Sequence, residues 1–273
     1  MSWLRNIDRR VIYVLLFILV LYPLVKPMGL PVSIGPWTKA CYDYIEKNIK
    51  PGDKVVVSFD YSSGGAPDVD PQAVAVVKHL FKRGARIIGV AFVDQGVLFA
   101  TPVFDAWGKQ GKKDGTDFVN LGFLAGGETA VAAFGNDPIK AFPKDINGKD
   151  TASMPIMQGV KTAADFKFIA AFATGAPGPS EWVRQVGTKY KTPYMAGLVT
   201  VMAPGAEPYL QSKQMVGLLA GLRGAAEYEN AQGEPGRAVA GMDAQSMGHI
   251  VIILFVILGN VLYLLDKPKK AKA

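Results

Sequence analysis

The feature that most constrains this chain is a pair of apolar stretches near its two ends, at residues 11–25 and 250–265. Crossing a bilayer takes about 20 apolar residues. Each stretch approaches that length because flanking side chains such as Arg10 and Lys26 can extend toward the headgroups. We therefore expect membrane helices at 11–27 and 249–265. Two alternatives stay open: a cleaved signal peptide for the first stretch, although no A-x-A site follows it, and a buried core helix for the second.

Basic residues flank each stretch on its terminal side. Residues 1–10 hold three arginines and one aspartate, and residues 266–273 hold four lysines and one aspartate. Lysine and arginine close to a membrane helix favour the cytoplasmic side. We therefore expect two cytoplasmic tails, an extracytoplasmic domain over 28–230 and a linker over 231–248, in the inner membrane of a bacterial cell. The lipid bilayer is the first partner that the sequence predicts.

The net charge of +7 does not indicate nucleic-acid binding. The two tails carry +2 and +3, so the remaining residues hold only +2. A nucleic-acid site needs basic residues gathered on the folded domain. We therefore predict no nucleic-acid partner.

The region between the stretches repeats one pattern: an apolar run, a turn rich in Gly, Pro and Asp, and an amphipathic helix. Continuously apolar strands are typical of a parallel sheet covered on both faces. We expect an α/β domain with an open, doubly wound, mostly parallel five-stranded sheet, flavodoxin-like or Rossmann-like. The order 2-1-3-4-5 is the first choice. The expected strands are 54–61, 86–93, 117–124, 166–173 and 194–202, and the helices that follow them are 71–83, 97–109, 128–142, 180–190 and 209–230.

The turns after the strands supply the candidate ligand site. Ligands of open α/β sheets bind outside the carboxyl ends of the strands, where small residues let backbone N–H groups face an anion. The alternative is that such turns are glycine-rich in any fold of this class, because they need glycine to change direction. The candidates for binding a small anionic ligand are Asp60, Ser62, Ser63, Gly64, Gly65, Gly126, Gly127, Glu128, Thr174 and Gly175.

Signatures of catalysis, metals and cofactors are missing from the sequence, so we name no catalytic residue, metal or cofactor. The phosphate-binding, dinucleotide-binding and nucleophile-elbow motifs do not occur. Of the two histidines, His79 is expected to be solvated on a polar helix face, and the single cysteine, Cys41, to be a buried thiol. Ser180 is expected to cap the helix that follows it. A carboxylate-dependent hydrolase using Asp60, Asp68 and Asp70 is the catalytic alternative to turn and capping roles.

Small residues in the expected 209–230 helix suggest a contact surface. Gly217, Gly221, Gly224 and Ala225 would form one stripe, and glycine inside a helix costs about 1 kcal/mol relative to alanine. Such a stripe predicts the close approach of another backbone, either the domain's own sheet or a second subunit. Asn260 would place a polar amide inside the second span, where it could bond a neighbouring helix. We expect a homo-oligomer or other envelope membrane proteins as partners.

Three segments carry a resemblance: VSFDY at 57–61, MVGLLAGLRGAAEY at 215–228 and GMDAQS at 241–246. With them the chain resembles bacterial membrane proteins that have two spans around an extracytoplasmic α/β domain. The resemblance implies this topology and brings no activity or site residues. We predict a non-catalytic scaffold or assembly subunit of an envelope complex. The alternative is a membrane-tethered binding or sensory domain for a small anionic ligand.

Overall fold

The computed structural model describes residues 8–266, so most of each predicted basic tail lies outside the described residues. Within this range the chain divides into two compact units. Val32–Glu234 forms the α/β unit, and the segments on either side of it form a second, helical unit. The boundaries lie close to the 28–230 domain that the sequence predicts.

The α/β unit is built on an open sheet of six parallel strands in the order β3-β2-β1-β4-β5-β6. The predicted fold class is therefore confirmed, whereas the five strands and the order 2-1-3-4-5 are wrong. The observed order is that of the Rossmann type, in which successive strands are added outward on both sides of β1 and β4. The strands are β1 Lys54–Asp60, β2 Arg86–Ala91, β3 Phe118–Phe123, β4 Phe168–Ala173, β5 Tyr194–Leu198 and β6 Gly217–Ala220.

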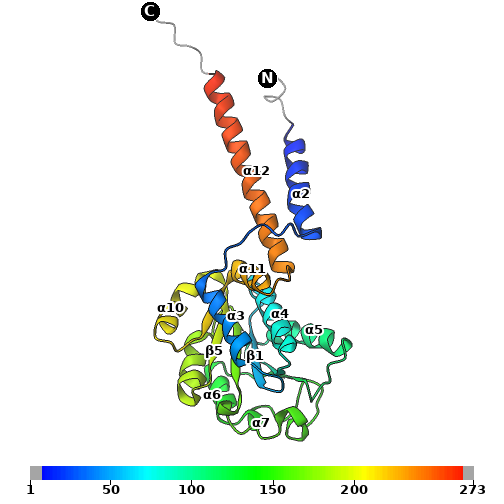
Figure 1. Ribbon diagram of the computed structural model, residues 1–273, viewed down its shortest axis with the longest axis vertical. Helices are drawn as coiled ribbons and strands as arrows, with labels where there is room; N and C mark the ends of the chain where they lie inside the picture. The colour runs from blue at the N-terminus through cyan, green and yellow to red at the C-terminus, as the bar shows by residue number, and fades with distance from the viewer. Residues whose placement is uncertain (1–7, 267–273) are drawn as a thin grey trace, which may run out of the picture. The chain divides into compact units, whose positions relative to one another are not determined.

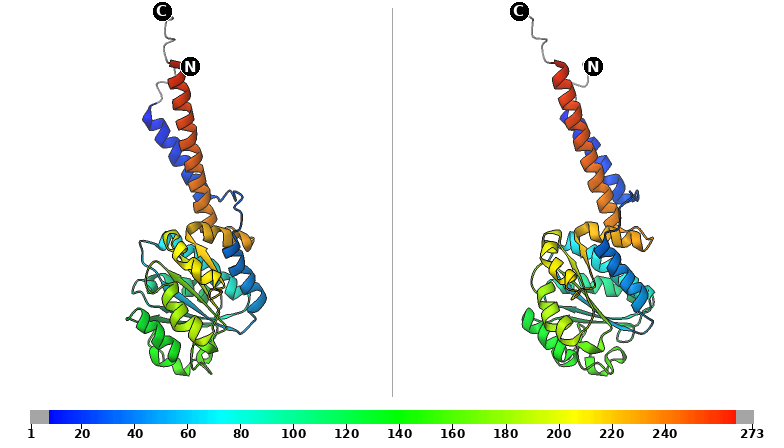
Figure 2. Two further views of the ribbon diagram at one scale, coloured as in Figure 1. Left: turned by 90° about the vertical axis from the view of Figure 1, so that its left-hand side faces the viewer. Right: turned by 60° about the vertical axis from the view of Figure 1, so that its left-hand side comes forward.

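Helices cover both faces of the sheet (Figure 2). One face packs against α3 Pro36–Asn48, α4 Ala66–Lys82, α5 Gly96–Lys109 and α11 Gly221–Ala231. The other packs against α6 Glu128–Asn136, α8 Pro179–Trp182, the π-helix Val183–Gly187 and α10 Ala203–Gln211. Alternate residues of β1 enter the two cores: Val55 and Phe59 lie in the first and Val56 in the second. This two-sided burial is why the strands are continuously apolar.

The sixth strand corrects the helix predicted over 209–230. That segment contains the end of α10, the strand β6 and all of α11 except its last residue. Gly221 has φ +59°, a left-handed conformation that lets the chain turn directly from strand to helix. At Gly217 an added Cβ would lie 2.5 Å from Cys41 Sγ, so the close approach inferred from the glycines is made by α3 of the same domain.

Two helix starts differ from their predictions. α4 begins at Ala66 with Gly65 as its N-cap, so Pro71 lies inside the helix instead of beginning it. Ser180 lies within α8, whose N-cap is Gly178, and its hydroxyl donates to Glu181 Oε1. The segment predicted as one helix over 128–142 contains two, α6 and α7 Pro138–Ala141. The remaining short helices are Thr151–Ser153, Pro155–Met157, Ala163–Asp165, α9 Thr188–Tyr190 and Thr200–Met202.

The helical unit contains α2 Arg9–Val25 and α12 Arg237–Asp266, which lie beside each other (Figure 1). Arg237–Leu264 is long and apolar enough to cross a membrane, whereas Arg10–Val25 is a shorter apolar helix. Most large side chains of both helices are exposed, with Phe17 at 65% and Leu254 at 59%. The linker predicted over 231–248 is wrong for most of its length, because α12 begins at Arg237.

Asp243 joins the two helices of this unit. Its side chain is 1% exposed and accepts hydrogen bonds from the backbone N–H groups of Met28 (2.7 Å), Gly29 (2.8 Å) and Leu30 (3.1 Å). These residues directly follow α2. A carboxylate that satisfies three backbone donors fixes the chain where it leaves α2, so the pairing of α2 with α12 has a defined register.

Candidate functional site

The structure brings together part of the site predicted at the carboxyl edge of the sheet. β1 and β4 are neighbours, so the loops that follow them meet there. The backbone N–H of Ser62 donates to Thr174 Oγ1 (3.1 Å), and the N–H and hydroxyl of Ser63 both donate to Gln95 Oε1 (2.8 Å each). A Cβ added at Gly64 or Gly175 would meet no heavy atom within 4 Å. These residues form a small polar surface at the switch point of the strand order.

Asp60 lies beneath this surface and does not face it. Its side chain is fully buried and accepts from Ser58 Oγ (2.7 Å), Phe92 N (2.8 Å) and Trp182 Nε1 (3.0 Å). Burial raises the pKa of Asp60 to about 6, against the opposing effect of these donors. The carboxyl group connects β1, β2 and α8 inside the core, and all its contacts there are internal.

Glu128 is held by the π-helix that follows α8. Its carboxylate accepts hydrogen bonds from Arg184 Nε (2.7 Å) and Nη2 (2.9 Å) and from the Gln185 side-chain amide (2.7 Å). These hydrogen bonds lower the pKa of Glu128 to about 2. Gly126 and Gly127 form the turn before it, both with positive φ. The role of these residues in ligand binding stays a prediction.

The carboxylates of the catalytic alternative do not converge. Asp70 Oδ1 accepts from the Tyr61 hydroxyl (3.0 Å), whereas Asp60 is enclosed by its own three donors. Asp68 belongs to the first turn of α4. Between residues 8 and 266 no group of three or more His, Cys, Asp or Glu side chains is arranged to hold a metal ion. The geometry gives the hydrolase hypothesis no assembled acid and base.

The residues of the predicted interface contact other parts of the same chain. A Cβ on Gly221 would lie 2.0 Å from Thr200 Oγ1, and one on Gly224 would lie 3.0 Å from the Leu219 backbone. Ala225 is fully buried. In the helical unit, Asn260 Nδ2 donates to Val256 O (2.7 Å) of its own helix. A subunit contact through these positions stays a prediction, and they form no single helical stripe.

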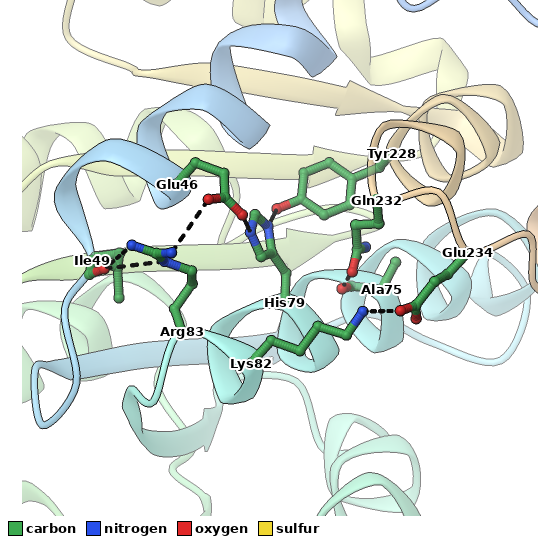
Figure 3. A network of polar contacts seen from close by, with 9 residues as sticks. All are labelled: Glu46, Ile49, Ala75, His79, Lys82, Arg83, Tyr228, Gln232 and Glu234. Carbon is green, nitrogen blue, oxygen red and sulfur yellow. Dashed lines mark hydrogen bonds and ion pairs between the residues drawn. The ribbon is translucent and has the colours of Figure 1, made fainter.

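His79 corrects the sequence analysis most directly, because it is 2% exposed and not solvated. Figure 3 shows it between Glu46 of α3 and Tyr228 of α11. Its Nε2 lies 2.7 Å from Glu46 Oε1, and its Nδ1 lies 2.7 Å from the Tyr228 hydroxyl. Since a carboxylate can only accept, Nε2 donates and Nδ1 accepts from the tyrosine. Burial lowers the pKa of His79.

Further contacts continue from this cluster over the surface of α4. Arg83 pairs with Glu46, and its guanidinium reaches the Ile49 carbonyl. Glu234 pairs with Lys78 and Lys82. The network therefore connects α3, α4 and the end of α11 (Figure 3), which is a stabilising role. The buried thiol predicted at Cys41 is confirmed: it is fully buried, and burial raises its pKa.

Comparisons with known proteins add little to this geometry. The chain is similar to the crystal structure of AibC, with a TM-score of 0.30 and 13% sequence identity. The match covers 82% of this chain and 54% of the AibC chain, so this chain spans about half of its length. No protein-family model matches the sequence, and no curated protein matches it. A similarity of this size carries no argument about function, and no family is assigned.

Proposed function

We propose that this protein is a non-catalytic, membrane-anchored scaffold or assembly subunit of a bacterial envelope complex. Both α2 and α12 cross the inner membrane, both tails lie in the cytoplasm, and the α/β unit makes protein–protein contacts on the outer side. One observation carries the proposal: α2 over most of its length, and α12 from Ile250 onward, expose apolar side chains. Apolar surface of this extent on a helix pair is what lipid tails or neighbouring membrane helices would cover.

The state of the candidate catalytic groups supports a non-catalytic role. Asp60 has three internal donors, Glu128 is held by Arg184, and His79 is buried between two side chains. An acid or base needs a path to the proton it transfers. Each of these groups instead joins two or more elements of the same domain, as expected for a rigid body that presents a surface.

Cross-linking and native mass spectrometry of the full chain in mild detergent test the assembly role. We expect a defined oligomer, or a complex with other envelope proteins, that survives extraction. The oligomer should persist when Asp60 or Glu128 is replaced by alanine, provided that the variant folds. A strictly monomeric particle without a co-purifying protein contradicts the proposal.

A second candidate is a tethered binding domain for a small anionic ligand at the carboxyl edge. The contact of Ser62 with Thr174 favours it, because this contact unites the loops after β1 and β4. A thermal-shift screen of small anions against the full chain tests it, with Ser63→Ala and Gly175→Ala as site variants. A ligand that stabilises the wild type but neither variant supports this role. Stabilisation by no anion, or equal stabilisation of all three proteins, contradicts it.

A further inference from the structure

A groove runs along the amino-terminal edge of the sheet. The ligand site predicted from the sequence lies at the opposite, carboxyl edge. One cavity of about 660 Å³ lies among the turns that lead into β5 and β6. A second cavity of about 400 Å³ lies among the turns that lead into β1 and β4. The two share one wall, formed by Tyr44, Lys191, Thr192 and Pro193. We call the two together the amino-edge groove.

Lysines from four separate segments of the chain line this groove. They are Lys54, Lys167, Lys191 and Lys213. In the described part of the chain, the side chains of Lys191 and Lys213 are exposed and form no ion pair. The phenol group of Tyr44 lines both cavities, and its ring stacks on Phe168 at 5.0 Å between centroids. The groove therefore offers several N–H and O–H donors.

The groove contains two carboxylates against four lysines. Asp165 Oδ2 accepts from the backbone N–H groups of Lys161 (2.8 Å) and Thr162 (2.9 Å), and Asp53 Oδ2 accepts from that of Lys50 (2.8 Å). Both carboxylates thus stabilise their own turns. The pKa of Lys54 is lowered by burial and by the nearby charge of Arg86, whereas the charge of Asp165 raises it, so Asp165 offsets part of the positive charge at Lys54. The groove has a surplus of positive charge because its cations outnumber its carboxylates.

Backbone conformation singles out the same two lysines. Lys191 and Lys213, with φ of 56° and 58°, are the only non-glycine residues of positive φ between residues 8 and 266. This left-handed conformation is unfavourable for a residue with a Cβ, and glycine would adopt it freely. Both positions carry lysine, and both line the larger cavity. Both residues end helices, since Lys191 is the C-cap of α9 and Lys213 directly follows the C-cap of α10, so the left-handed conformation serves to terminate these helices and places both lysines at the mouth of the cavity.

We propose that the amino-edge groove binds a phosphate group. Lysine ammonium groups recognise phosphate as point charges, without the planar geometry that arginine imposes. Lys191 and Lys213 contact the phosphate oxygens, Lys54 and Lys167 extend the positive field, and the Tyr44 hydroxyl donates from the shared wall. Pro193, Met215 and Val216 give the larger cavity an apolar side for the remainder of the ligand. This site goes beyond the assembly role and does not depend on it.

The test uses the full chain in neutral detergent micelles, with two sources of phosphate measured separately by thermal shift. One arm titrates inorganic pyrophosphate at constant ionic strength. The other adds phosphatidylglycerol to the micelles, with phosphatidylcholine as the lipid control. The site variant is Lys191→Gly with Lys213→Gly, which removes both charges and suits the left-handed backbone. The matched control is Lys113→Gln with Lys140→Gln, which removes two exposed lysines outside both cavities.

We expect saturable stabilisation of the wild type and the control in at least one arm. Binding by the glycine variant should be weaker by about tenfold or more, while its own unfolding temperature is equal to or above that of the wild type. Binding of pyrophosphate alone assigns a soluble phosphate ester, and binding of phosphatidylglycerol alone assigns a lipid headgroup. Stabilisation in neither arm, or equal binding by the glycine variant and the control, overturns the proposal.

Discussion

The buried carboxyl of Asp60 makes a sharp prediction about stability and pH. Its pKa is raised from 3.8 to about 6 because the charged form is costly inside the core. For an acid whose pKa is higher in the folded state, the favourable contribution is complete below the unfolded value and is lost as the pH rises through the folded value. The loss is about 3 kcal/mol, at about 1.36 kcal/mol for each pH unit between the two values.

The substitution Asp60→Asn keeps the shape of the side chain and removes its titration. The variant loses an acceptor for one of the three donors, and this loss lowers the free energy of unfolding by the same amount at every pH. Between about pH 4 and about pH 7.5 the variant should therefore gain about 2–3 kcal/mol relative to the wild type. This corresponds to a relative rise of about 5–10 °C in the unfolding temperature for a domain of this size.

The assay is thermal unfolding of the full chain in detergent micelles, followed by tryptophan fluorescence at both pH values. Comparing each variant with the wild type cancels the titration of other groups, His79 included. Asp94→Asn makes the same charge change on an exposed side chain after β2 and serves as the control. A constant difference between Asp60→Asn and the wild type at the two pH values would refute the reasoning.

Three further predictions follow from single contacts. A buried histidine with a lowered pKa stabilises the fold only while it is neutral, so the wild type should lose stability as the pH falls below about 6.5. His79→Gln should reduce this loss. If unfolding temperatures measured over a pH series fall equally steeply for the variant and the wild type in this range, the prediction is wrong. Gly217→Ala should destabilise the fold by about 1–3 kcal/mol, since its Cβ would lie 2.5 Å from Cys41 Sγ. Gly205→Ala should not destabilise the fold, because its Cβ would have nothing within 4 Å. Equal unfolding midpoints for the two variants contradict this prediction. The pair Val20→Cys with Gly248→Cys should form a disulfide, because a Cβ at 248 lies 3.8 Å from Val20 Cγ2. Adding Asp243→Ala should lower the yield of this cross-link. An unchanged yield would show that Asp243 does not pair the two helices.

The alternation of strands and helices could be predicted from sequence because each buried strand is a continuous apolar run. β6 could not, since it is four residues long, begins with a glycine and is followed directly by another. Its apolar residues also fit a helical spacing when read together with those of α11. The three glycines of that segment were the available signal, because their cost inside a helix argues against one.

The environment of His79 could not be predicted for a related reason. Its partner Tyr228 follows it by 149 residues and is placed by the β6–α11 turn. The amino-edge groove could not be predicted, because its lysines come from four separate segments of the chain and share no spacing. The rule that ligands of open α/β sheets bind at the carboxyl ends of the strands predicts a site at the opposite edge.

The membrane topology is the central claim, and site-specific cysteine labelling tests it most directly. Val201 is 86% exposed on the α/β unit, and the native Cys41 is fully buried, so its background labelling is low. In intact spheroplasts an impermeant maleimide should label Val201→Cys, and it should label Lys269→Cys only after the membrane is disrupted. Labelling of Lys269→Cys in intact spheroplasts, or protection of Val201→Cys until disruption, would contradict the account.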